Sequence, residues 1–152
     1  MQNSALKYKD ENDRSLGLAG SAIALVIWDG EDKLAAIDLD SLPGEGMEMT
    51  PDFNFAGNPR LSARLAWQMM LKQFELTSAM VMGNVLCRSY VGQGRQPSSS
   101  ARAALRAILR DEAISACSLE DDEFDQMYSR LLDLQSQIFA HNEVATMART
   151  LA

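Results

Sequence analysis

The sequence predicts an α+β fold, in which an N-terminal antiparallel β-hairpin, or a small three-stranded sheet, packs on a C-terminal bundle of three to four helices. The apolar run at 20–28 is rich in β-branched and aromatic residues, and residues 33–40 alternate apolar with polar side chains. Beyond residue 59 the apolar residues recur at helical spacing. Because 152 residues is an ordinary size for one domain, we expect a single domain over 16–152.

The first 15 residues are polar and charged, and we expect them to form a mobile tail. The first apolar stretch begins only near Leu16, behind three acidic side chains, which is unlike a secretory signal. The sequence contains no apolar run of about 18 residues, the length that a membrane-spanning helix needs. We therefore predict a cytoplasmic protein without a membrane partner.

The predicted hairpin pairs residues 20–28 with residues 33–40 across Asp29-Gly30-Glu31-Asp32. Glycine tolerates a positive φ and aspartate caps turns, so this sequence favours a tight reversal. Residues 20–28 are apolar on both faces of the expected strand, so helices or another subunit should cover its second face. In the long segment 41–58, Met47 and Met49 alternate with polar residues, which allows a short third strand.

The helical part begins at Asn58-Pro59, which has the chemistry of a helix start. Residues 59–91 form either one helix or two, and apolar side chains cover most of its circumference. Such a segment is central in the fold or lies in a homo-oligomer interface. Further helices are predicted at 99–117, from 118 to 139 and at 143–150. The candidate interface residues are Trp67, Met70, Phe74 and Val81.

Charge is distributed in three blocks along this acidic chain, whose net charge is −7. Residues 1–58 carry −7, residues 59–110 carry +7 and residues 111–152 carry −7. Blocks of opposite sign usually offset each other when their elements pack, and we favour this interpretation over a basic patch that binds an acidic partner. The two cysteines, Cys87 and Cys117, lie among apolar neighbours, so we expect reduced and buried thiols.

A candidate ligand site is the loop at 92–100 with the start of the next helix. Two glycines let the backbone approach a ligand, and an arginine supplies a fork of hydrogen-bond donors. The serines lie at a helix N-terminus, where free N–H groups favour anions such as phosphate or carboxylate. The alternative is a flexible loop that ends in a serine cap. The candidate residues are Gly92, Gly94, Arg95, Ser98, Ser99, Ser100 and Arg102.

Three further patterns carry weaker hypotheses. His141 is the only histidine and a candidate general base, although a polar helix end is the favoured explanation. Asp38 and Asp40 share one strand face and are candidate metal ligands, or the wet face of an edge strand. Three arginines spaced along the helix at 99–117 form a stripe that suits phosphates, but an acidic chain without interleaved aromatic residues makes a nucleic-acid partner the least favoured. These arginines are Arg102, Arg106 and Arg110.

No catalytic constellation in the sequence is complete, and no cofactor is indicated. The leading hypothesis is therefore a non-catalytic interaction or assembly protein that forms a homo-oligomer. The alternative is a binder of, or an enzyme acting on, a small anionic ligand held at the 92–100 loop.

Overall fold

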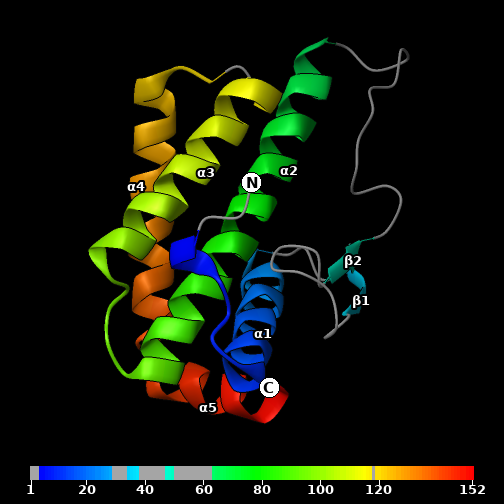
Figure 1. Ribbon diagram of the computed structural model, residues 1–152. Helices are drawn as coiled ribbons and strands as arrows, with labels where there is room; N and C mark the ends of the chain where they lie inside the picture. Colours follow the sequence, from blue (N-terminus) through cyan, green and yellow to red (C-terminus); the bar gives the residue numbers. More distant parts are fainter. Residues whose placement is uncertain (1–3, 29–33, 38–46, 50–62, 118) are drawn as a thin grey trace.

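The structure is a computed structural model that describes residues 4–28, 34–37, 47–49, 63–117 and 119–152, and it is a helical bundle (Figure 1). Helices α1 to α4 stand side by side, and α5 crosses one end of the bundle. The described α-helices are α1 (Glu11–Ile27), α2 (Ala63–Cys87), α3 (Ser99–Cys117), α4 (Asp121–Phe139) and α5 (Asn142–Leu151). A 3₁₀ turn, η1 (Ser4–Leu6), precedes α1, and a π-helix, η4 (Arg88–Gln93), continues α2. The predicted α+β fold is therefore wrong.

The apolar run at 20–28, predicted to be a strand, belongs almost entirely to the C-terminal part of α1. The Asp10 side chain caps this helix by accepting a hydrogen bond from the backbone N–H of Asp13 at 2.8 Å. Glu11 and Asp13 add negative charge to the first turn, where the helix dipole favours it. Ile23, Ala24 and Leu25 are buried against neighbouring segments, which explains the apolar character of the middle of the run, whereas Val26 and Ile27 at its end are exposed.

The predicted pairing of 20–28 with 33–40 does not occur. The strands in the described part of the chain are β1 (Leu34–Ile37) and β2 (Met47–Met49), which pair antiparallel with Ile37 opposite Met47. This short two-stranded ladder forms no layer of the bundle (Figure 1).

Helices α1 and α2 make direct backbone contact at two glycines. A Cβ atom on Gly20 would lie 2.1 Å from the carbonyl oxygen of Gly83, and one on Gly83 would lie 2.5 Å from that of Gly20. Ser21 Oγ adds a hydrogen bond to the carbonyl of Met80 at 2.8 Å across the same interface. Only glycine permits this approach, which brings the polar residues near the start of α1 against the end of α2.

The segment 59–91 contains one continuous helix rather than two in its described part, because α2 runs unbroken from Ala63 to Cys87. Its last turn widens into η4, and Gly94 ends the helical path with a left-handed φ of 67°. The N–H of Gly94 donates to the carbonyl of Ser89. The chain thereby turns sharply toward α3, and the predicted helix at 99–117 is confirmed.

The core lies between α2, α3 and α4, and α1 and α5 cover its sides. Cys87 and Cys117 are free and buried, as predicted. Burial raises the pKa of the Cys87 thiol to about 12. The fully buried side chains at the centre include Met82, Leu86, Leu105, Leu109, Phe124, Leu131 and Phe139.

Basic side chains of α3 form ion pairs with acidic side chains of α4. Arg106 is paired with Asp125, and Arg110 Nη2 lies 2.7 Å from Asp121 Oδ1. At these two pairs the expected offsetting of charge blocks is confirmed, and neither arginine is left to form a phosphate-binding stripe. The capping box of α4 is formed by Glu120 and its N3 residue, Glu123.

Candidate functional site

Arg88 fixes the N-terminal segment to the bundle. Its side chain is 9% exposed, and it forms a salt bridge with Asp13 at 2.9 Å. Its Nη1 donates to the carbonyl of Leu6 at 2.9 Å, and Nη2 donates to that of Lys7 at 2.7 Å. The ring of Tyr8 lies 4.6 Å below the guanidinium carbon. Residues 6–10, predicted to be part of a mobile tail, are therefore docked on the end of α2.

The carboxylate of Asp13 is charged because its surroundings favour that form. Burial raises its pKa. Hydrogen bonds from the Arg88 side chain and from the Lys9 backbone N–H lower the pKa, as do the positive charges of both residues, and together these effects outweigh that of burial. The pKa of Asp13 consequently lies below its ordinary value. Arg88 and Asp13 thus form a compensated pair under the docked segment.

A pocket of about 120 Å³ lies between this docked segment, η4 and the first turn of α3. We call it the basic pocket, because four basic side chains and no acidic side chain are among its lining residues. The charge of Arg88 is offset by Asp13, whereas Lys7, Lys9 and Arg95 form no ion pair with any described carboxylate. The lining residues are Ala5, Leu6, Lys7, Lys9, Val85, Arg88, Ser89, Gln93, Arg95, Ser98 and Ala101.

Ser98 places the N-terminus of α3 at the wall of the basic pocket. Its Oγ accepts a hydrogen bond from the N–H of Ala101 at 3.1 Å, and its carbonyl accepts one from Arg102 at 2.9 Å. Ser98 is therefore the N-cap, and the helix dipole adds positive potential at this wall. On the same side, Arg95 Nε donates to Gln93 Oε1 at 3.2 Å, which orients the guanidinium.

The structure brings together only two of the seven residues predicted for the anion site, Arg95 and Ser98. Gly94 lines a different cavity, and Gly92 belongs to η4. The remaining three lie on the first turn of α3 outside both cavities, namely Ser99, Ser100 and Arg102. The lysines of the pocket were missed because they lie about 90 positions upstream, in the segment interpreted as a tail.

The candidate interface residues divide into different environments. Phe74 is buried, and Val81 packs against the core of this single chain. Met70 is half-buried, and the side chain of Trp67 lies outside the described residues. The burial of Phe74 therefore needs no second subunit.

The other candidates do not form a site in the described residues. His141 is the exposed N-cap of α5, and its Nδ1 accepts a hydrogen bond from the N–H of Glu143 at 3.2 Å. Asp38 and Asp40 lie outside the described residues. Within the described ranges, no group of three or more His, Cys, Asp or Glu side chains could hold a metal ion.

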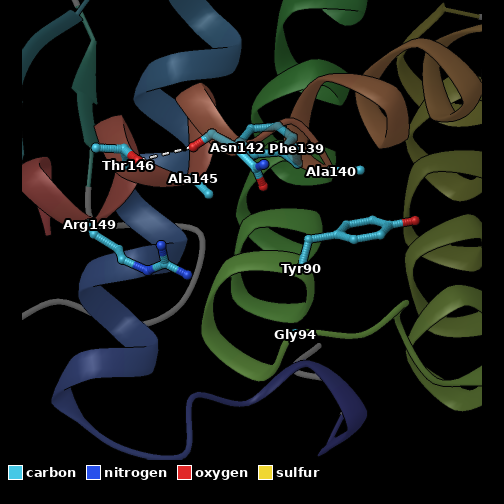
Figure 2. A pocket seen from close by; sticks show the side chains of 8 residues that line it. All are labelled: Tyr90, Gly94, Phe139, Ala140, Asn142, Ala145, Thr146 and Arg149. Carbon is cyan, nitrogen blue, oxygen red and sulfur yellow. Dashed lines mark hydrogen bonds between the residues drawn. The ribbon is translucent and has the colours of Figure 1, made fainter.

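A second cavity is an open cleft of about 460 Å³ on the other side of η4, which we call the α5 cleft (Figure 2). One stripe of α5 forms a wall, because four of the lining residues recur at helical spacing along it. The end of α4 and the π-helix form the rest. The lining residues are Tyr90, Gly94, Phe139, Ala140, Asn142, Ala145, Thr146 and Arg149.

The fold and these cavities define a helical-bundle protein with a small basic pocket. In three comparisons, the chain matches no protein-family model, no curated protein and no solved structure. None of the helices in the described parts of the chain combines the length and the apolar character that crossing a membrane requires.

Proposed function

We propose that the protein binds a small anionic ligand in the basic pocket, through a phosphate or carboxylate group. The observation that carries this proposal is the absence of acidic side chains from a lining that holds Lys7, Lys9 and Arg95 without ion-pair partners among the described residues. The side chains of Lys7, Lys9 and Arg95 are exposed at this lining, and an anion that enters the pocket interacts favourably with their charges. Phe74, one of the candidate interface residues, is buried within one chain and offers no surface for self-assembly.

The size of the basic pocket limits what enters it. At about 120 Å³ it is well below the roughly 300–1,000 Å³ of pockets that enclose drug-sized molecules. It therefore suits one anionic group, and the remainder of a larger ligand would extend into solvent. Arg95 offers two parallel donors to such a group, while the lysines act as mobile point charges.

The pair formed by Arg88 and Asp13 supports binding indirectly. Because the two charges compensate each other, the pair offers no free charge to the anion. It holds the Leu6 and Lys7 carbonyls, and therefore the backbone that carries both lysines, against the end of α2. The cost of ordering this segment is met on folding rather than on binding, which favours affinity. The pocket is in this sense preorganised.

The test is isothermal titration of the full chain with inorganic phosphate and, separately, with acetate. We expect the wild type to bind at least one of them, and the Lys7→Gln/Arg95→Gln variant to lose at least tenfold in affinity. The matched control is Arg102→Gln/Arg130→Gln, which removes the same charge from exposed positions outside the basic pocket and should bind as the wild type does. Absence of wild-type binding, or equal losses in the two double variants, would contradict the proposal.

A further inference from the structure

The docked N-terminal segment carries its contacts with the bundle and two cations of the basic pocket on neighbouring residues. The ring of Tyr8 lies 4.6 Å from the guanidinium carbon of Arg88, and its hydroxyl accepts a hydrogen bond from Asn84 Nδ2 at 2.8 Å. Lys7 and Lys9, on either side of Tyr8 in the sequence, are exposed and line the basic pocket. The tyrosine therefore faces the bundle while both lysines face the pocket.

Polar contacts dominate the attachment of this segment to the bundle. Arg88 donates to the carbonyls of Leu6 and Lys7, and the backbone N–H of Lys9 donates to Asp13 Oδ2 at 2.9 Å. The side chain of Leu6 is only half-buried where it packs against the core. A segment that buries little apolar surface opens locally at a lower free energy than the core of the protein does. We therefore expect undocking of residues 6–9 while the bundle stays folded.

Undocking of this segment takes the basic pocket apart. Lys7 and Lys9 leave with the segment, whereas Arg95 and Ser98 stay on the bundle. An anion that contacts both parts of the pocket binds the docked state more tightly than the undocked state. A ligand shifts an equilibrium between two states by its difference in affinity for them, so such an anion favours docking.

From this arrangement we infer that anion binding in the basic pocket is coupled to the docking of residues 6–9, so that the ligand controls how often this segment leaves the bundle. The inference rests on the proposed function, because it needs an anion in that pocket. Tyr8 is the positioning residue: it is absent from the lining and acts by holding the two lysines beside it. Coupling of this kind is reciprocal, so the anion protects the docked segment, and a looser segment weakens anion binding.

The first test is amide hydrogen exchange of the full chain in saturating inorganic phosphate, or in acetate where only acetate binds, compared with chloride at the same ionic strength. The reporter is the backbone N–H of Lys9, whose hydrogen bond to Asp13 must break before exchange. We expect its exchange to slow by at least about fivefold, the lower end of typical coupling between sites. The control is the N–H of Ala152, which is bonded to the Ala148 carbonyl at 3.0 Å outside the basic pocket and should keep its rate.

Two variants of Tyr8 test the reciprocal effect by isothermal titration with the same anion. Tyr8→Ala removes the ring and the hydrogen-bond acceptor but none of the charges that meet the anion, and we expect the affinity to fall at least about fivefold. Tyr8→Phe keeps the ring over Arg88 and loses only the hydrogen bond from Asn84, so most of the affinity should return. Circular dichroism verifies that both variants fold.

The outcomes separate this inference from the proposed function. A bound anion that leaves the exchange rate of Lys9 unchanged, or equal affinities of the wild type and Tyr8→Ala, would overturn the coupling and leave anion binding intact. Slowing of Lys9 that persists in Lys7→Gln/Arg95→Gln would also overturn it, because that variant lacks two cations of the pocket. If the wild type binds neither anion, the proposed function fails and this inference fails with it.

Discussion

Arg88 donates hydrogen bonds to both carboxylate oxygens of Asp13, from Nε to Oδ1 at 3.1 Å and from Nη2 to Oδ2 at 2.9 Å, across 75 positions of sequence. Both side chains are about a tenth exposed. A two-bond pair shielded from water has a defined geometry that a surface pair lacks. This pair joins α1 to η4, which continues α2, and supports the segment that lines the basic pocket.

Removing the negative charge of this pair should destabilise the protein. Asp13→Asn keeps the size of the side chain but leaves Arg88 as an uncompensated, mostly buried cation, at a cost of about 3 kcal/mol in the free energy of unfolding. Urea denaturation measures this loss. The control is Asp133→Asn, an exposed position on α4, which should change stability by less than about 0.5 kcal/mol. Similar values for the two variants would show that the pair contributes little.

The same pair predicts the response to acid. The pKa of Asp13 in the folded protein lies below its ordinary value of 3.8, so its contribution is complete above that value and is lost as the pH falls through the folded pKa. The stability difference between the wild type and Asp13→Asn should therefore stay constant near neutrality and shrink below about pH 4. Denaturation curves at a series of pH values measure it. A difference that grows on acidification would refute this explanation.

A methyl group added at the contact of α1 with α2 should lower the stability of the protein. In Gly83→Ala the new Cβ would meet the carbonyl oxygen of Gly20 at 2.5 Å, so the helices must separate. Overpacking costs about 1–3 kcal/mol, and the helix propensity of alanine returns up to about 1 kcal/mol, so we expect a net loss of about 1–2 kcal/mol in thermal or urea unfolding.

Gly92→Ala is the matched control for this substitution. A Cβ atom at Gly92 would have Leu16 Cδ1 as its nearest neighbour, at 3.0 Å, and this atom is the movable end of a flexible side chain. We expect a change within about 0.5 kcal/mol. If both alanine variants were equally stable, close packing at Gly83 would not be limiting.

The thiols should be inert in the folded protein. Cys87 and Cys117 are buried, and burial raises the pKa of Cys87 to about 12, so almost no thiolate is present near neutral pH. A thiol-reactive chromophore should modify both cysteines rapidly in concentrated guanidinium chloride and neither one in buffer, except at the rate of transient opening. Rapid modification of one equivalent in buffer would place a thiol at the surface.

The sequence was informative where local chemistry determines the structure. The helix at 99–117 combines a serine cap with a clear apolar face, and it was predicted with its observed bounds. The strand assigned to 20–28 failed because β-branched residues in a two-sided apolar run suit a buried helix as well as a buried strand. Gly20 serves the contact with Gly83, which no local pattern reveals.

The candidate site was predictable in part for a similar reason. Arg95 and Ser98 are close in sequence and carry recognisable helix-start chemistry. Lys7 and Lys9 reach the same pocket only because Arg88 binds the carbonyls beside them, at separations of more than 80 positions. Such a long-range hydrogen bond has no counterpart in the spacing of residues along the chain.

Anion binding in the basic pocket can be measured directly by an amide ¹H–¹⁵N titration of the wild type with inorganic phosphate and with acetate. We expect at least one of these anions to give saturable shifts concentrated at residues 5–9 and 93–101, with smaller changes at the α5 cleft. Shifts spread evenly over exposed arginines of α3 and α4, or no saturable shift with either anion, would contradict it.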